Sequence, residues 1–324
     1  MDTLQQVKVV FGILSANNPA DIVQQIIDSL GNDCYVIVHH DYGQRPDFVL
    51  TGENVYVIEN PVRTGWGVWS QVEAILSLLQ HAKTHCEFDY FQLLSDSCLP
   101  IRPLSEFKQK LATQRPDIMM DFVDIKTNQA VFLSHSYRCY IPFKTFLNRI
   151  YGRARLWALG PGPYTVEKIA GLGIPLTQRG VTRLARIKQM IGRSFVSTLR
   201  LRDFITHRPR VYVGSTWFCV SRQACEFILS KASDSNYTAH FARLNGPDEI
   251  FFPTIIGNSH FRKLVPANHA TIWRQRGSGP EEIQEADLPS IMNSDRFFAR
   301  KFSKQSDQPV RNAVLARNRK ASEK

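Results

Sequence analysis

The feature that most constrains this chain is a regular alternation of apolar runs and helix-spaced segments over its first 122 residues. Short apolar runs of this kind are typical of buried strands, and they occur at 7–14, 34–38, 54–58 and 90–94, with a further strand expected at 117–122. Between them, apolar residues recur at helical spacing in 21–30, 68–79 and 103–112. The alternation predicts an α/β, Rossmann-like fold whose mostly parallel central sheet carries helices on both faces.

Ligands of such sheets bind beyond the carboxyl ends of the strands, and two predicted strands end in acids. Asp41 follows His39-His40, and we interpret it as a metal ligand, a nucleotide contact or a turn former. The fourth strand ends in "LLSDSCLPI", where Asp96 is followed two positions later by Cys98. Two acids in the pattern Asp-x-Asp would hold a divalent metal on a diphosphate. The sequence therefore indicates either a metal site without one ligand or a site that binds a diphosphate without metal.

Acids also mark the start of a predicted helix in Gly246-Pro247-Asp248-Glu249, which is followed by an apolar run. Carboxylates in the first turn lie beside unpaired backbone N–H groups. Glu249 is placed to act as a general base if it reaches a substrate hydroxyl. The alternative is that Asp248 and Glu249 only favour the helix start.

Cations form a second group near the carboxyl end of the chain, at Arg274, Arg276, Arg300 and Lys301. The last two lie between phenylalanines in "FFARKF", so we expect at least one to be held against packed surface. Oriented Arg and Lys side chains stabilise a departing diphosphate without coordination chemistry. The alternative is a surface pair whose stems lie on apolar neighbours. Trp66, between two glycines, is either a stacking platform for a base or a core anchor.

The charge of the chain favours anionic partners, because 40 Lys+Arg stand against 29 Asp+Glu for a net +11. Hydrophobic residues make up 43% of the 324 positions, which suffices for a sizeable core. We predict one domain over 1–304, a basic, mainly helical insertion at about 134–209, and a flexible polar tail over 305–324. The six cysteines show no C-x-x-C pair and are expected to be reduced and mostly buried. P-loop and dinucleotide-binding motifs are absent from the sequence.

Six segments in order resemble the core-2/I-branching β-1,6-N-acetylglucosaminyltransferase and peptide O-xylosyltransferase family, glycosyltransferase family 14. They are "VIVHHD", "GWGVWSQVEAIL", "YFQLLSDSCLPI", "VGSTWFCVSRQACEFIL", "GPDEIFFPTIIGNS" and "ADLPSIMNSDRFFARKF". The resemblance spans most of the chain up to Phe302 and omits the region 134–209. The family often has glycine before the acid at the fourth strand end, where this chain has Ser95.

The resemblance implies a GT-A-like fold, an inverting mechanism, a UDP-sugar donor and no required metal or other cofactor. Glu249 would be the base that deprotonates the acceptor hydroxyl, and Lys301 would contact the UDP diphosphate. Arg276 or Arg274 matches an upstream arginine of the family. Asp41 and Trp66 would lie at the nucleotide. The sugar and acceptor pocket would hold Trp217, Asp248 and Asp96, the last as a turn-shaping residue at the pocket floor.

These implications predict a metal-independent inverting transferase that moves GlcNAc from UDP-GlcNAc to a glycan hydroxyl. The alternatives are an O-xylosyltransferase that uses UDP-xylose, and a non-catalytic basic module that binds polysaccharide or membrane. No nucleic-acid partner is expected. The beginning of the chain shows no signal peptide and no segment has the apolar length of a membrane span, so we expect a bacterial-type, cytoplasmic protein. A lipid-linked acceptor in polysaccharide biosynthesis would bring its basic face to the inner membrane.

Overall fold

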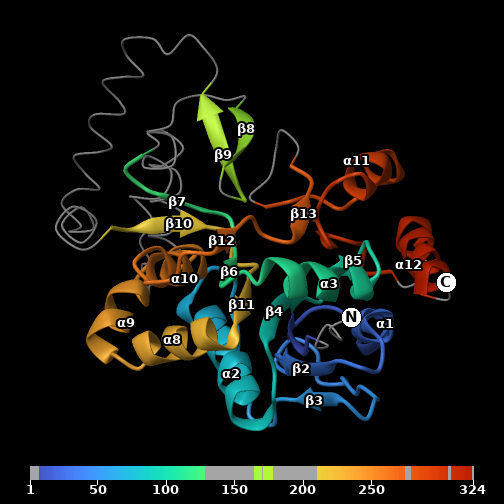
Figure 1. Cartoon of the computed structure of the whole chain (residues 1–324), viewed down its shortest axis with the longest axis horizontal. Helices are drawn as coiled ribbons and strands as arrows, with labels where there is room; N and C mark the ends of the chain where they lie inside the picture. Colours follow the sequence, from blue (N-terminus) through green and yellow to red (C-terminus); the bar gives the residue numbers. More distant parts are fainter. Residues whose placement is uncertain are drawn as a thin grey trace.

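A seven-stranded sheet lies at the centre of the structure, a computed structural model that describes residues 7–127, 164–169, 171–177, 210–273, 279–305 and 308–322 (Figure 1). Its strands are β1 (Val9–Ser15), β2 (Tyr35–His40), β3 (Val55–Val57), β4 (Tyr90–Ser95), β6 (Ile118–Met119), β11 (Cys219–Ser221) and β12 (Leu264–Val265). They lie in the order β12-β6-β11-β4-β1-β2-β3. Within this sheet every strand runs parallel to the others except β11, which is antiparallel to both neighbours. The predicted mostly parallel α/β fold is confirmed.

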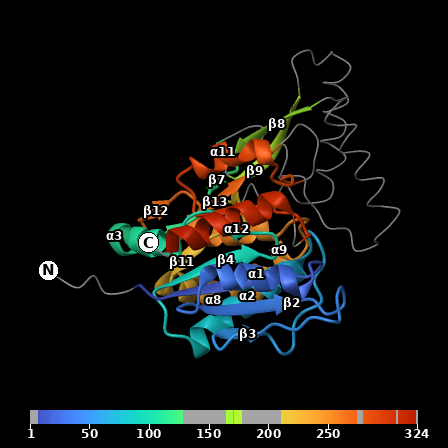
Figure 2. The same ribbon diagram turned by 90° about the vertical axis from the view of Figure 1, so that its right-hand side faces the viewer.

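Helices cover both faces of this sheet, each over its own apolar cluster (Figures 1 and 2). The first face carries α2 (Trp69–His85), α8 (Arg222–Ala232), α9 (Ser235–Phe241) and α10 (Asp248–Gly257). The second carries α1 (Ala20–Leu30), α3 (Leu104–Gln114), α11 (Leu288–Met292) and α12 (Pro309–Ser322), with the short 3-10 helix η1 (Glu285–Asp287) before α11. Successive residues of one strand therefore enter different clusters, as Val10 and Phe11 do in β1. A fully apolar run is what such a two-sided burial requires.

The middle of the sheet is closely packed because β1 carries a glycine beside an aromatic ring of β4. A Cβ atom at Gly12 would lie 2.3 Å from Cζ of Phe91, a distance that no side chain tolerates. Glycine at this position lets the Phe91 ring lie across β1. The contact joins β1 and β4, whose carboxyl ends lead into the turns that contain Asn18 and Asp96.

The carboxyl ends of the parallel strands share one edge of the sheet. The chain places β2 and β3 on one side of β1 and β4 on the other, so the loops after β1 and β4 diverge. Such a reversal of strand order opens a crevice where ligands of α/β proteins bind. Asp41 and Asp96, which follow β2 and β4, both lie at this edge, as the sequence predicts.

A three-stranded sheet brings the end of the chain to this crevice. It consists of β13 (His269–Thr271), β14 (Phe298–Arg300) and β5 (Leu99–Pro100). The strand β5 belongs to the turn that follows Asp96, and the N–H of Phe302 donates to the carbonyl of Ser97 at 2.9 Å. Residues about two hundred positions apart therefore meet beside the carboxyl edge.

Beyond residue 304 the structure corrects the expected flexible tail, because 309–322 form the helix α12. Val310, Val314 and Leu315 are buried in the second cluster. Burying one such side chain contributes about 1.5–3 kcal/mol. Arg311 is also buried and donates to Gln25 and to the carbonyl of Ile22 on α1. The apolar stripe at i, i+4 and i+5 is short and lies within a basic sequence, which is why the sequence indicated a tail.

Two further strand pairs lie beside the main sheet, β7 (Phe122–Asp124) with β10 (Tyr212–Gly214) and β8 (Tyr164–Ile169) with β9 (Leu172–Thr177). The single strand expected at 117–122 is thus two strands, since the chain leaves the main sheet after Met119. In the expected helical insertion the described part is the β8–β9 hairpin, and its Arg-rich part at 178–209 lies outside the described residues. None of the helices that the structure describes combines the length and apolar character needed to cross a membrane.

Candidate active site

The turn after β4 uses its acid to hold the neighbouring loop. The carboxylate of Asp96 accepts the N–H groups of Ala16 at 3.2 Å and Asn18 at 3.4 Å, and its carbonyl accepts the side-chain amide of Asn18. Burial raises the pKa of Asp96, and the two backbone donors oppose that shift. The acid therefore closes the turn across the β1–β4 crevice, a backbone role of the kind expected for a turn-shaping residue.

Cys98, at the position where an Asp-x-Asp motif has its second acid, is fully buried. Its Sγ lies 3.3 Å from the N–H of Ser95 and 3.2 Å from the Ser95 hydroxyl. Burial raises the pKa of this thiol, which disfavours the thiolate that a metal would need. Among the described residues no three His, Cys, Asp or Glu side chains are grouped so as to hold a metal ion.

Asp41 is buried after β2 and also binds backbone. Its Oδ1 accepts the N–H of Gly43 at 2.9 Å, and its Oδ2 accepts both the N–H and the hydroxyl of Thr64 at 2.8 and 2.9 Å. These bonds tie the end of β2 to the segment that leads to Trp66. Of the three interpretations given by the sequence, the turn former describes these contacts.

The two histidines before Asp41 are buried and support the same segment. The N–H of Val62 donates to Nε2 of His39 at 3.0 Å, while His40 contacts the Ser15 hydroxyl at 3.0 Å and the carbonyl of Arg45 at 2.8 Å. Burial lowers the pKa of His39 to about 4 and also lowers that of His40. Both rings are thus neutral at pH 7.

Trp66 lies on the surface, with 80% of it exposed, so the interpretation as a core anchor is wrong. Gly67 has φ +70°, a conformation that suits glycine, and its carbonyl accepts the N–H of Gly246 at 2.8 Å. Gly246 lies just before α10. The backbone next to Trp66 is consequently held beside the helix that begins with Asp248 and Glu249.

The two acids at the start of α10 have different surroundings. Asp248 is buried, and its Oδ2 accepts the Thr216 hydroxyl and the side-chain amide of Gln71 at 3.2 Å. Glu249 is half-buried and lies within electrostatic reach of Arg300. Asp248 thus joins α10 to α2 and to the segment before β11, and both acids lie within electrostatic reach of Arg300 on β14.

Arg300 lies among the expected site residues, although the sequence indicated Lys301 as the functional cation. Its guanidinium carbon is 4.2 Å from the centre of the Trp217 ring, a cation–π contact. Burial lowers the pKa of Arg300, and the acids Asp96, Asp248 and Glu249 oppose the shift. One guanidinium therefore lies between the turn after β4 and the start of α10. The only sequence signal for it was the pair of flanking phenylalanines, which indicated that at least one of the two cations is held against packed surface.

Trp217 is buried, so its ring contacts protein on more than one side. One face meets Arg300, and the ring centre of His269 on β13 is 5.9 Å away. Burial lowers the pKa of His269 well below its usual range, with Arg300 and Arg296 adding to the effect. The buried Trp217 ring thus packs against the guanidinium of Arg300 and holds it in place.

Lys301 is half-buried and lies beside Gly279, where a Cβ atom would be 3.6 Å from its Nζ. Burial and the neighbouring Arg300 lower the pKa of Lys301, and Glu282 opposes them. Its ammonium therefore lies near the backbone of Gly279. Arg274 and Arg276 lie outside the described residues.

The fold and the site are those of an α/β protein of GT-A-like architecture with a charged site at the carboxyl edge of its sheet. The family model described as Core-2/I-Branching enzyme matches residues 30–137 and 176–297. Because these ranges are more than half of the chain, the chain belongs to the Core-2/I-branching family and is a glycosyltransferase. A comparison with curated proteins found no match. The resemblance seen in six sequence segments is confirmed.

Proposed function

We propose that this glycosyltransferase is inverting, needs no metal ion, and moves N-acetylglucosamine from UDP-GlcNAc to a hydroxyl of a glycan. The observation that supports this most is the position of Arg300 over the Trp217 ring, within electrostatic reach of Asp96, Asp248 and Glu249. A carboxylate and a cation lie together where ligands of such sheets bind. Family membership supplies the reaction class, and these residues supply the chemistry.

Glu249 acts as the general base in this proposal. Its carboxylate takes the proton of the acceptor hydroxyl while that oxygen forms a bond to the anomeric carbon. The bond from the same carbon to the diphosphate breaks, and UDP leaves with the electron pair. Displacement from the opposite face inverts the configuration at the anomeric carbon.

The charge that develops on UDP is stabilised by cations. Lys301, together with Arg276 or Arg274, contacts the diphosphate in this proposal, and Arg300 adds a positive charge next to the base. Cations fixed by packing need no reorganisation as charge develops. Cys98 has no part in the chemistry, since its buried thiol only completes the turn.

The test is Glu249→Gln, with Glu73→Gln as the matched control because Glu73 is exposed on α2. We expect Glu249→Gln to lower turnover about 10²- to 10⁴-fold, since it removes the base. UDP should raise the apparent stability of both variants and of the wild type equally, with EDTA present. Full turnover by Glu249→Gln would exclude the mechanism.

Donor screening separates the alternatives. Turnover with UDP-xylose in place of UDP-GlcNAc would favour the O-xylosyltransferase. A basic binding module, by contrast, would show no stabilisation by UDP and would bind anionic polymers in a salt-sensitive manner that Glu249→Gln leaves unchanged.

We further propose that the acceptor is a lipid-linked glycan of a bacterial surface polysaccharide, reached by peripheral contact with anionic membrane. The net charge of +11 supports this contact. Flotation with anionic vesicles should carry the protein upward, and neutral vesicles or high salt should not. Absence of flotation with anionic vesicles would remove the proposal.

A further inference from the structure

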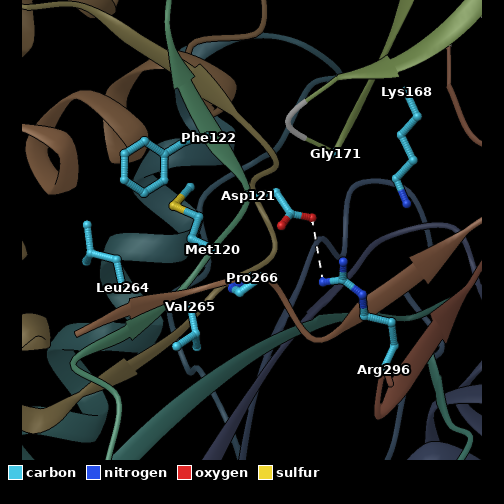
Figure 3. Close-up of a pocket in the computed structure, with 9 residues that line it drawn as sticks. All are labelled: Met120, Asp121, Phe122, Lys168, Gly171, Leu264, Val265, Pro266 and Arg296. Carbon is cyan, nitrogen blue, oxygen red and sulfur yellow. Dashed lines mark ion pairs between the residues drawn. The ribbon is translucent and has the colours of Figure 1, made fainter. Parts of the chain in front are cut away.

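A pocket of about 560 Å³ opens beside the site and contains none of the residues expected from the sequence (Figure 3). Its volume lies in the range of roughly 300–1,000 Å³ that is usual for small-molecule sites. It is lined by Met120, Asp121, Phe122, Lys168, Gly171, Leu264, Val265, Pro266 and Arg296. Lys168 belongs to the β8–β9 hairpin, which lies over this end of the main sheet.

The pocket lies at the same carboxyl edge as Asp41 and Asp96. Asp121 follows β6 and Pro266 follows β12, and both strands run parallel to β4 with β11 between. The N–H of Ser215 donates to the carbonyl of Asp121 at 2.9 Å, so the segment that leads to Trp217 forms the boundary between the pocket and the site.

His269 is part of this boundary, because it lies within electrostatic reach of Arg300 in the site and of Arg296 and Lys168 in the pocket. A molecule in the pocket is consequently a neighbour of the Glu249 and Arg300 site. In the proposed reaction that neighbour is the acceptor, since Lys301 and the nucleotide lie toward β1 and β4.

One wall of the pocket is charged. Nη1 of Arg296 donates to the carbonyl of Ala267 and lies 3.8 Å from Oδ2 of Asp121, and its Nε lies 3.3 Å from the exposed Asp295. Asp121 also accepts the N–H of Ala267 at 3.0 Å. The guanidinium is thus fixed in place and its charge is offset by two acids.

Lys168 supplies the positive charge that remains. Figure 3 shows its ammonium pointing toward Arg296 and Asp121, and it makes no ion pair with any residue in the described parts of the chain. Burial lowers the pKa of Lys168, Asp121 opposes the shift and Arg296 adds to it. An anion placed between the ammonium and the guanidinium would relieve their repulsion.

The opposite wall is apolar, formed by Met120, Phe122, Leu264, Val265 and Pro266 (Figure 3). A pocket with one apolar and one cationic wall fits a sugar that has a C–H face and one anionic substituent. A neutral sugar would leave Lys168 without a counter-charge, and a small inorganic anion would leave the apolar wall exposed to water.

We propose that this pocket is an acceptor subsite for a sugar unit that carries an anionic group, with a carboxylate or phosphate held by Lys168 and Arg296. The identification of this sugar as the acceptor rests on the proposed transferase function. The pocket itself should bind an anionic sugar more tightly than its neutral counterpart.

Three matched probes test it on the full chain: methyl β-glucoside, methyl β-glucuronide and methyl β-glucoside 6-phosphate. Binding is measured by NMR titration at low salt, with UDP present. We expect at least one anionic probe to bind about tenfold more tightly than the neutral one, the effect of a hydrogen bond between charged groups. A tighter glucuronide identifies a uronic acid, and a tighter 6-phosphate identifies a sugar phosphate.

Lys168→Gln should remove this preference, because it removes the ammonium and leaves a neutral polar side chain in its place. Lys231→Gln, which removes an exposed charge from α8, is the control and should retain the preference. Equal binding of the neutral and anionic probes by the wild type, or an unchanged preference in Lys168→Gln, would overturn the proposal. Stabilisation by UDP is measured on the same samples. If UDP does not stabilise the protein but Lys168→Gln still loses the preference for the anionic probe, the proposed transferase mechanism is rejected and the anion-binding pocket is retained.

Discussion

The two halves of the carboxyl edge use carboxylates in different ways. Beyond β1, β2 and β4, Asp41 and Asp96 accept hydrogen bonds from backbone N–H groups and hold loops in place. Beside the segment that leads into the antiparallel strand β11, Glu249 lies in a helical first turn near Arg300, which covers the Trp217 ring. An acid at a strand end can therefore shape a site through backbone hydrogen bonds alone. Chemistry is expected where an acid and an oriented cation lie together.

After Glu249 itself, Lys301 should affect turnover most. We expect Lys301→Ala to lower turnover about 10²- to 10³-fold, because one charge on the departing diphosphate loses its partner. The unfolding midpoint should change little, since Lys301 is only half-buried. Turnover of the variant and the wild type is measured in EDTA, where the wild type should keep full activity.

Lys304→Ala is the control for this prediction, because Lys304 is exposed and close to Lys301. It removes the same charge and should leave turnover within about twofold, as expected for an exposed group screened by solvent. Loss of wild-type activity in EDTA would show that a metal supplies the charge assigned here to Lys301.

The first half should instead respond in stability. Asp41→Asn keeps the shape of the side chain but loses one acceptor atom and the charge that holds Gly43 and Thr64. A hydrogen bond to a charged group contributes about 1.5–3 kcal/mol, so we expect a loss of about 3 kcal/mol in the free energy of unfolding. Denaturant titration measures it, with Asp47→Asn as the exposed control. An unchanged midpoint would mean that these bonds do not stabilise the loop.

The buried His39 should also make the free energy of unfolding depend on pH. Its pKa is about 4 in the folded chain and near 6.5 when unfolded, so between these values the unfolded state binds the extra proton. Stability should therefore be full above pH 6.5 and fall as the pH drops toward 4, by up to about 3 kcal/mol. A proton on Nε2 would also break the bond from the Val62 N–H. His39→Gln should flatten this part of the stability profile, and an equal slope in wild type and variant would assign it to other groups.

The sequence predicted the first half of the edge well because local patterns determine it. Apolar runs placed β2 and β4, and the polar residues after each run placed Asp41 and Asp96 at the strand ends. The second half depends on contacts between distant positions, such as Gln71 with Asp248, which no local pattern contains. The assignment of the cation had the same limit. The sequence indicated Lys301, but only the pairing of β14 with β5 and β13 showed that Arg300 lies between the acids.

The smallest expected effect concerns Trp66, where the two halves meet. Asp41 holds Thr64, and Gly67 accepts the N–H of Gly246, so the backbone that carries this exposed indole connects a loop of the first half to the helix of the second. Stacking of a ring on an exposed indole is worth about 1–3 kcal/mol, and Trp66→Ala should raise one KM roughly tenfold with little change in stability. A raised KM for the UDP-sugar would assign Trp66 to the nucleotide, whereas a raised KM for the acceptor would place it with Glu249. Kinetics with each substrate varied in turn distinguish these outcomes, and an unchanged KM for both would mean that the indole contacts neither.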